Sequence, residues 1–181
     1  MTDGVPHTLM PPFAKSQGGG LSNSPLRDIL DAGIPYDSVC FKDASGTAVP
    51  SKVHETIKRA RQILPEGTFI HFHTHDTAGT QAAAIMAAAE VGLDIADAAM
   101  APLSGGTSQV NLNTLSEAFR FDDRPTGLAS EHLDSVADYW LAVRDFYTAF
   151  ESAALPGTAD LYNHCLLYTS DAADEGLGVD L

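Results

Sequence analysis

The sequence predicts an α/β fold built around a parallel sheet. Short apolar segments rich in β-favouring residues alternate three times with amphipathic or alanine-rich segments of helical length. The alternation repeats at about the length of a βαβ unit, in which the strands run parallel and the crossover is right-handed. In such folds functional residues gather at the carboxyl ends of the strands, so a functional site is expected there.

Composition limits the classes of function. The chain has 181 residues, 44% of them hydrophobic, so we expect a globular domain with a buried core. The formal net charge of −14 argues against a nucleic-acid partner and against docking on an anionic membrane face. The chain has no transmembrane-length apolar run, no signal-peptide pattern and only two cysteines. We therefore expect a cytoplasmic protein without direct membrane insertion.

The first part of the chain is expected to hold an irregular segment and one strand between two helices. Residues 1–25 are dense in Pro, Gly and Ser and have no period, which predicts irregular structure. A short helix then ends at Gly33, and residues 36–42 form a buried strand. Residues 51–64 form an amphipathic helix that Ser51 is placed to cap.

The remainder of the chain continues the alternation. A second strand, an alanine-rich helix and a third strand are followed by a Gly/Ser loop and two helices, the last of which carries an apolar stripe. These segments are residues 67–73, 79–92, 93–101, 102–109, 110–120 and 130–150; the stripe is Leu133, Val136, Tyr139 or Trp140, Val143, and Phe146 or Phe150.

Three histidines occur at alternate positions where the second strand ends: His71, His73 and His75. Alternate residues of a strand share a face, so His73 and His75 can present neutral imidazole nitrogens to one divalent ion. Asp76 could orient one of the rings, and His71 lies deeper, where packing or support of the ligands is expected. The alternative is that each histidine is simply hydrogen-bonded at a strand end.

Lys42 ends the preceding strand, at the same edge of the predicted sheet. An ammonium there is costly to desolvate unless it is paired or neutralised. Lys42 could reach solvent or pair with Asp43. Alternatively, its neutral amine could react with carbon dioxide, and the resulting carbamate would be an oxygen ligand for the same ion.

Three blocks of sequence resemble, in order and distance, successive blocks of the biotin-dependent carboxyltransferase family. They are "FKDASGTAVP", "HFHTHDTAGT" and "DIADAAMAPLSGGTSQ". This family includes pyruvate carboxylase, the oxaloacetate decarboxylase alpha subunit and transcarboxylase, and its (β/α)8 barrel is related to that of HMG-CoA lyase. The resemblance covers residues 26–164 and implies a partial (β/α)8 TIM barrel of about three βα units plus a following helix.

The resemblance also implies a site. Lys42, as a carbamate, His73 and His75 match the family's metal ligands; no catalytic or biotin-binding residue is assigned. The metal would be Zn, Mn or Co, and biotin would be carried on a partner domain or subunit. A carboxyl group would move between carboxybiotin and pyruvate or oxaloacetate, with the ion stabilising enolate charge. The full protein is expected to be a homo-oligomer.

The match is incomplete. A full barrel needs about 250 residues, and the family's first-strand Asp ligand, substrate-binding Arg and proton-shuttling Thr have no counterpart in this chain. We therefore expect the chain alone to be an inactive fragment. Residues 165–181, "CLLYTSDAADEGLGVDL", resemble the translation of a transposase adapter used in DNA sequencing libraries, so the native sequence is expected to end at about His164.

Two other enzyme classes are compatible with some of these features. A lyase or acyl-CoA condensing enzyme of the HMG-CoA-lyase-like superfamily shares the H-x-H pattern, although the "KD" block and the "SGGTSQ" loop fit carboxyltransferases better. A metal amidohydrolase also combines H-x-H with a carbamylated lysine, but there the histidines precede the lysine, whereas Lys42 comes first here.

Overall fold

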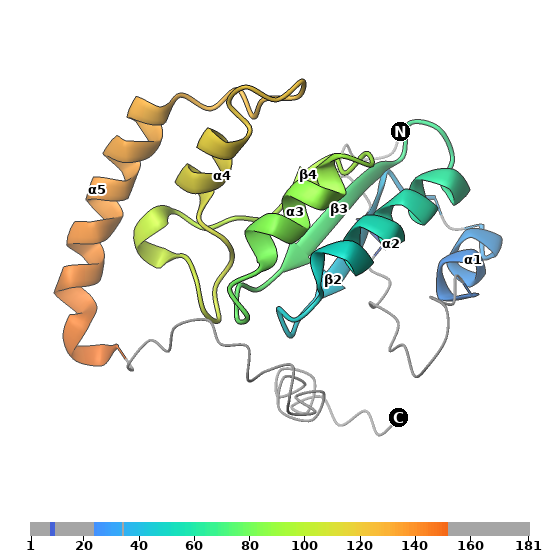
Figure 1. Cartoon of the computed structure of the whole chain (residues 1–181). Helices are drawn as coiled ribbons and strands as arrows, with labels where there is room; N and C mark the ends of the chain where they lie inside the picture. Colours follow the sequence, from blue (N-terminus) through green and yellow to red (C-terminus); the bar gives the residue numbers. More distant parts are fainter. Residues whose placement is uncertain (1–7, 10–23, 34, 152–181) are drawn as a thin grey trace, which may run out of the picture. The chain divides into compact units, whose positions relative to one another are not determined.

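Four parallel strands form one sheet in the part of the chain that the computed structural model describes, residues 8–9, 24–33 and 35–151 (Figure 1). Neighbouring strands in the sheet are also neighbours in the sequence, as in successive βα units. The predicted parallel α/β fold is therefore confirmed. The strands are β1 (Thr8–Leu9), β2 (Ser38–Asp43), β3 (Phe69–Thr74) and β4 (Ile95–Ala96).

The strands differ from the prediction mainly at the edges of the sheet. β2 and β3 pair over six residues each, as expected, from Ser38 beside Phe69 to Asp43 beside Thr74. β4 is only two residues long, because the alanines and Asp97 that follow it have little preference for extended structure. β1 pairs with β2 although it lies within the stretch expected to be irregular.

The described residues fall into two compact units, and we describe each by itself. Among the described residues, the first unit takes 8–9, 24–33, 35–44, 48–74 and 83–96, and it holds the sheet and the helices around it. The second unit takes 45–47, 75–82 and 97–151, and it holds the loops that follow β2 and β3 and the described residues after β4. The helices of the first unit are α1 (Ser24–Asp31), α2 (Pro50–Ile63) and most of α3 (Gln81–Ala89).

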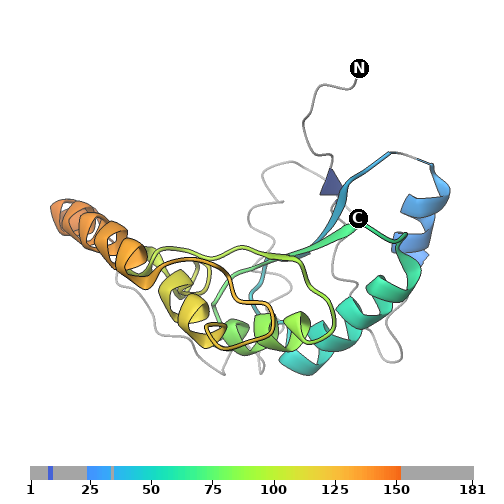
Figure 2. The ribbon, with the colours of Figure 1, turned by 90° about the horizontal axis from the view of Figure 1, so that it is seen from above.

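Helices α2 and α3 cover one face of the sheet (Figure 2). Ile70 and Phe72 of β3 point to that face and are fully buried. The buried apolar residues of each helix lie on one face, as a helix packed on a sheet requires: Val53, Ile57 and Ala60 on α2, and Ala84, Ile85 and Ala88 on α3. The predicted Ser51 cap is wrong, because α2 starts one residue earlier with Pro50 in its first turn and Val49 at the cap.

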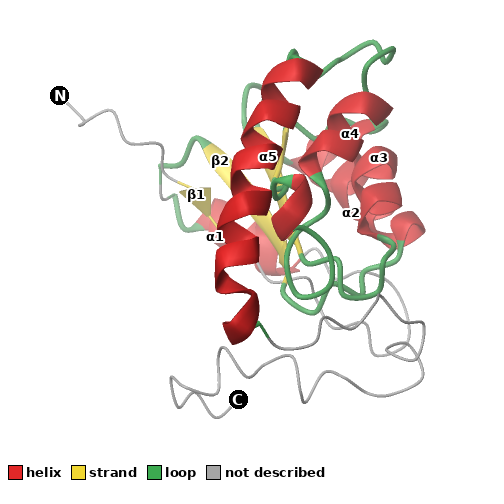
Figure 3. Cartoon of the chain, turned by 90° about the vertical axis from the view of Figure 1, so that its left-hand side faces the viewer, coloured by secondary structure: helices red, strands yellow, loops and turns green. Residues whose placement is uncertain are grey.

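The regular elements in the described part of the second unit are helical. The side chain of Asn111 caps α4 by accepting a hydrogen bond from the Thr114 amide at 3.0 Å. Helix α4 lies beside α5 (Figure 3). Along the apolar stripe of α5, Leu133 is buried but Phe146 is 78% exposed. The elements are η1 (Ala101–Leu103), α4 (Leu112–Ala118), α5 (Ser130–Tyr147) and η2 (Thr148–Phe150).

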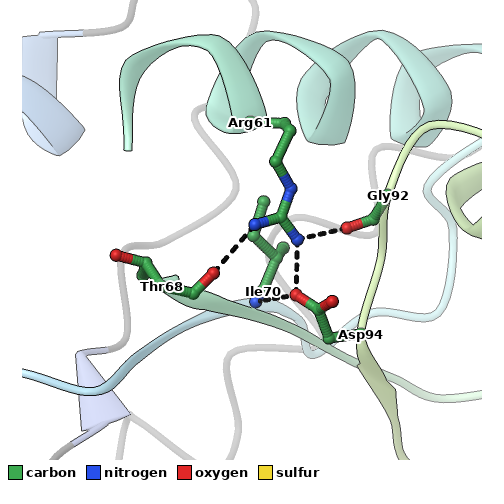
Figure 4. A network of polar contacts seen from close by, with 5 residues as sticks. All are labelled: Arg61, Thr68, Ile70, Gly92 and Asp94. Carbon is green, nitrogen blue, oxygen red and sulfur yellow. Dashed lines mark hydrogen bonds and ion pairs between the residues drawn. The ribbon is translucent and has the colours of Figure 1, made fainter. Parts of the chain in front are cut away.

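A polar network joins the end of α2 to the amino ends of β3 and β4 (Figure 4). The Arg61 guanidinium donates to the carbonyl oxygen of Thr68 at 2.8 Å, to that of Gly92 and to the Asp94 carboxylate. The same carboxylate accepts from the Ile70 amide at 2.7 Å. The Arg61 guanidinium group therefore connects α2 to the segments that precede β3 and β4. This network lies at the opposite end of the strands from Lys42 and His73.

No helix within the described residues is long and apolar enough to cross a membrane. Residues 165–181, for which a sequencing-adapter origin is expected, lie outside the described part of the chain, as do residues 1–7 and 10–23.

Candidate metal centre

Lys42 and His73 are direct neighbours across the sheet. The register of β2 and β3 pairs them, one residue before the carboxyl end of each strand. Both side chains are half-buried and belong to the face of the sheet that α2 and α3 do not cover. Because adjacent strands lie about 4.8 Å apart, two paired side chains on one face can reach a common ligand. The structure thus brings together two of the three residues singled out in the sequence.

His71 lies two positions below His73 on the same face, beside Cys40 of β2 and Ile95 of β4. Two residues along a strand correspond to about 6.6 Å, so His71 is further from the strand end, as expected. Asp43 leaves β2 on the opposite face from Lys42 and is 5% exposed. The alternative in which Lys42 pairs with Asp43 therefore does not fit the geometry.

The Asp43 carboxylate instead ties the strand ends together. Its Oδ2 accepts a hydrogen bond from Thr74 Oγ1 at 3.0 Å and another from the Ala48 amide at 3.0 Å. Asp43 and Thr74 are themselves a register pair, and Thr74 is fully buried. A buried carboxylate needs such donors to offset its desolvation. The two hydrogen bonds fix the carboxyl ends of β2 and β3, which carry Lys42 and His73.

His75 follows β3 and belongs to the second unit. Its Nδ1 lies 2.6 Å from the main-chain oxygen of Thr107. A carbonyl oxygen can only accept, so Nδ1 carries the proton and, in the neutral ring, Nε2 carries the lone pair. A histidine held in this way is prepared to bind a metal through Nε2.

The loops of the second unit are joined around His75. The carbonyl oxygen of Gly46 accepts hydrogen bonds from the Ala78 amide at 3.3 Å and from Gln81 Nε2 at 3.0 Å. Gly46 has φ +64°, and a Cβ there would lie 2.7 Å from the carbonyl carbon of His75. Only glycine allows the loop after β2 to approach the main chain at His75 this closely.

The sequence suggests that Asp76 orients one of the histidine rings. In the structure Asp76 Oδ1 accepts from the Gln81 amide at 3.2 Å and so supports the start of α3, while the Thr107 carbonyl oxygen accepts from the His75 ring. No pattern of side chains in the sequence could have identified a main-chain oxygen as this partner.

Within the described residues, no three His, Cys, Asp or Glu side chains form a group that could hold a metal. The candidate set is different, because its third member is Lys42, which would be a ligand only as a carbamate.

Comparison with known proteins identifies the family. The HMGL-like family matches residues 28–139, more than half of the chain. The chain belongs to the HMGL-like family. Its matched relatives include pyruvate carboxylase 1 of Caenorhabditis elegans, 34% identical over 126 residues, and the pyruvate carboxylase of Staphylococcus aureus, 34% identical over 131 residues. These alignments cover 68% and 71% of this HMGL-like chain.

Solved structures agree with this assignment. The carboxyl transferase domain of Rhizobium etli pyruvate carboxylase has a TM-score of 0.75 and 33% identity over 86% of this chain. The same domain with 3-hydroxypyruvate has a TM-score of 0.77 and 30% identity over 97%. The HMGL-like chain therefore has the fold of part of a carboxyltransferase TIM barrel, from a family of enzymes. It spans 11% of the length of the Caenorhabditis relative and 26% of the first Rhizobium chain.

Proposed function

We propose that this chain supplies the lysine- and histidine-bearing strands of a biotin-dependent carboxyltransferase, which moves a carboxyl group between carboxybiotin and pyruvate or oxaloacetate. The observation that carries the proposal is the pairing of Lys42 with His73 on the face of the sheet that α2 and α3 do not cover, in a chain related to pyruvate carboxylases. One solved relative, the Rhizobium etli carboxyl transferase domain, was determined with pyruvate and biocytin. Pyruvate as substrate and a biotin carrier as partner are proposed for this chain by that likeness.

The proposed ligands of a divalent ion are Lys42, as a carbamate, His73 and His75. Nitrogen and carboxylate-like oxygen donors suit Zn, Mn or Co. Two observations support the fit: Lys42 and His73 share a register position and a face, and the Nδ1–H of His75 is already committed to a carbonyl oxygen. When bound, such an ion supplies electrostatic stabilisation to developing enolate charge.

The carbamate forms on this chain's own lysine. The neutral Lys42 amine attacks the carbon of carbon dioxide, a C–N bond forms and one proton is released from nitrogen to solvent. Only the neutral form of the amine has the lone pair that this attack requires. Metal binding requires the neutral form of His73 and of His75, because a protonated imidazole has no lone pair for a metal.

The broader HMGL-like family keeps a second class open, a lyase or an acyl-CoA condensing enzyme with the same barrel. The relatives named above are pyruvate carboxylases, which favours carboxyl transfer. In the complete domain, exchange of carbon dioxide with oxaloacetate in the presence of biotin would support carboxyl transfer, whereas cleavage of an acyl-CoA substrate would support the alternative. A homo-oligomeric parent protein and a cytoplasmic location are part of the same proposal.

Metal analysis tests the ligand set on the chain itself. The purified chain is loaded with Zn, Mn or Co, desalted and analysed for metal. We expect stoichiometric binding that is lost in His73→Ala, in His75→Ala and in Lys42→Ala, but retained in His132→Ala, which alters an exposed histidine of α5. Equilibration with ¹³C-bicarbonate should give a carbamate signal in ¹³C NMR that is absent from Lys42→Arg. Metal retention in all three ligand variants contradicts the proposal.

The absence of activity in the isolated chain is also part of the proposal. The first-strand Asp ligand, the substrate Arg and the proton-shuttle Thr that the family resemblance implies have no match here, so the isolated chain should bind metal without transferring a carboxyl group. Turnover of pyruvate with carboxybiotin by the isolated chain would contradict this.

A further inference from the structure

The loop formed by residues 105–109 is bonded to the segment that carries His75. In addition to the contact between His75 Nδ1 and the Thr107 oxygen at 2.6 Å, the Asp76 amide donates to the Ser108 oxygen at 2.8 Å. Two consecutive carbonyl groups of the loop therefore accept hydrogen bonds from two consecutive residues after β3. All four residues belong to the second unit.

The loop itself is closed by its own main chain. The Gly105 amide donates to the Gln109 oxygen at 2.8 Å, and the Ser108 amide donates to the Gly105 oxygen at 3.0 Å. Gly105 and Gly106 have φ +87° and +57°, values that residues with a side chain rarely adopt. The two glycines thus set the turn that aims the Thr107 and Ser108 carbonyl groups at His75 and Asp76.

We infer that the Thr107 main-chain carbonyl, aimed by the Gly105–Gly106 turn, is a positioning group that holds His75 in its Nδ1–H form and so reserves Nε2 for a metal ion. The inference rests on the proposed function for the identity of the ligand at Nε2. The ring form itself follows from the hydrogen bond to the Thr107 oxygen, whatever ligand Nε2 takes. The partner is a main-chain atom, so the loop's backbone conformation, and not the Thr107 side chain, controls the ring.

This arrangement gives the "SGGTSQ" loop a specific role. A flexible connection would need no consecutive glycines of positive φ and no pairing with the chain after β3. Here the loop that follows β4 determines which nitrogen the histidine after β3 can offer. Hydrogen bonds of this kind around metal-binding histidines typically change metal affinity by about 10–100-fold.

The first measurement is made on the metal-free chain with ¹⁵N-labelled histidine. Couplings between the ring nitrogens and the carbon-bound ring protons distinguish the Nδ1–H form from the Nε2–H form, and the His75 signals are assigned by their loss in His75→Gln. We expect His75 to be in the Nδ1–H form at a pH where the ring is neutral. Predominance of the Nε2–H form in the unsubstituted chain overturns the inference without any further variant.

The second measurement changes the loop. Gly105→Val imposes a β-branched residue on a positive φ, although nothing lies within 4 Å of the added Cβ, so the perturbation is confined to the backbone. Gly127→Val is the matched control, because Gly127 has φ +72° and equally open surroundings. Gly105→Asn is the conservative variant, since asparagine tolerates positive φ better than other residues. Amide spectra report whether each variant is folded.

We expect Gly105→Val to shift His75 towards the Nε2–H form and to weaken zinc binding about 10–100-fold, measured by competition with a chelator. Gly105→Asn should recover most of both properties, and Gly127→Val should change neither. If Gly105→Val weakens zinc binding while the His75 ring form stays unchanged, the inference is overturned. A third outcome separates the two proposals. If the ring form responds as expected but neither the unsubstituted chain nor any variant binds zinc, the proposed function is wrong, whereas the positioning role of the loop is supported.

Discussion

The hydroxyl group of Thr74 donates to the carboxylate of Asp43 across the carboxyl ends of β3 and β2, with 3.0 Å between Oγ1 and Oδ2. Both residues are buried, and they are register partners. The positions immediately before them on the two strands are Lys42 and His73. The relative placement of these two proposed ligands therefore depends on a hydrogen bond made on the opposite face of the sheet.

Thr74→Val should destabilise the chain by about 1.5–3 kcal/mol, because valine keeps the volume of threonine but leaves a buried carboxylate with one donor fewer. Urea unfolding followed by circular dichroism measures the effect. Thr114→Val is the control, since Thr114 is exposed on α4 and its substitution should change stability by no more than about 0.5 kcal/mol. Equal losses of stability in Thr74→Val and Thr114→Val would show that the hydrogen bond from Thr74 to Asp43 does not stabilise the chain.

Gly46→Ala should be more harmful than Gly33→Ala, although the two glycines have nearly the same φ, +64° and +65°. Each substitution carries the cost of a left-handed conformation, roughly 1–2 kcal/mol. At Gly33 the added Cβ meets nothing within 4 Å, whereas at Gly46 it meets the main chain of His75 and lies 2.7 Å from Thr77 Oγ1. The overlap should add about 1–3 kcal/mol.

The same urea experiment compares these two variants, and zinc competition provides a second readout. Because the Gly46 overlap displaces His75, zinc affinity should fall in Gly46→Ala and remain unchanged in Gly33→Ala. A loss of stability in Gly46→Ala that is no greater than in Gly33→Ala would contradict the close approach of the two loops.

The strands and helices that the sequence predicts are found where local patterns are strong. β2 and β3 are rich in β-favouring residues, and α2 repeats its apolar residues at helical spacing. β4 shrinks to two residues because its alanine-rich segment has no such preference, and β1 arises from pairing with β2, which local sequence does not encode. Periodicity also identified the apolar stripe of α5, but only packing partners decide burial, and Phe146 and Phe150 are exposed.

The candidate site was predictable to the extent that it consists of side chains. The alternation of strand faces and the parallel register are enough to bring Lys42 beside His73. The groups that hold these residues in place are harder to recognise. The Thr107 carbonyl is a main-chain atom, and the contact between Asp43 and Thr74 joins residues 31 positions apart.

Arg61→Lys should lower stability without changing zinc affinity. Arg61 bonds two carbonyl oxygens and the Asp94 carboxylate at the amino ends of β3 and β4, away from the proposed ligands (Figure 4). A lysine cannot reproduce the planar fork, so we expect a loss of about 1–2 kcal/mol after allowing for partial solvent exposure. Arg59→Lys, in an exposed pair with Glu55, is the control and should change stability much less than Arg61→Lys. A fall in zinc affinity in Arg61→Lys would contradict the separation of this network from the site.

Ser130→Ala should raise the pKa of Glu117 towards the ordinary value for glutamate. In the native chain the Ser130 hydroxyl donates to the Glu117 carboxylate, and this hydrogen bond, helped by Arg120, lowers the pKa of Glu117. Because the pKa of Glu117 is lowered in the folded state, its hydrogen-bonded carboxylate stabilises the chain above the unfolded-state pKa. This contribution is lost as the pH falls through the folded-state pKa.

The ¹³C shift of the Glu117 carboxyl carbon, followed by NMR against pH, measures this titration. Its midpoint should lie at a higher pH in Ser130→Ala than in the unsubstituted chain. The Glu55 carboxyl, whose pKa is lowered mainly by Arg59, is the internal reference and should titrate identically in both proteins. If the Glu117 midpoint is the same in both, Ser130 is not the cause of its lowered pKa.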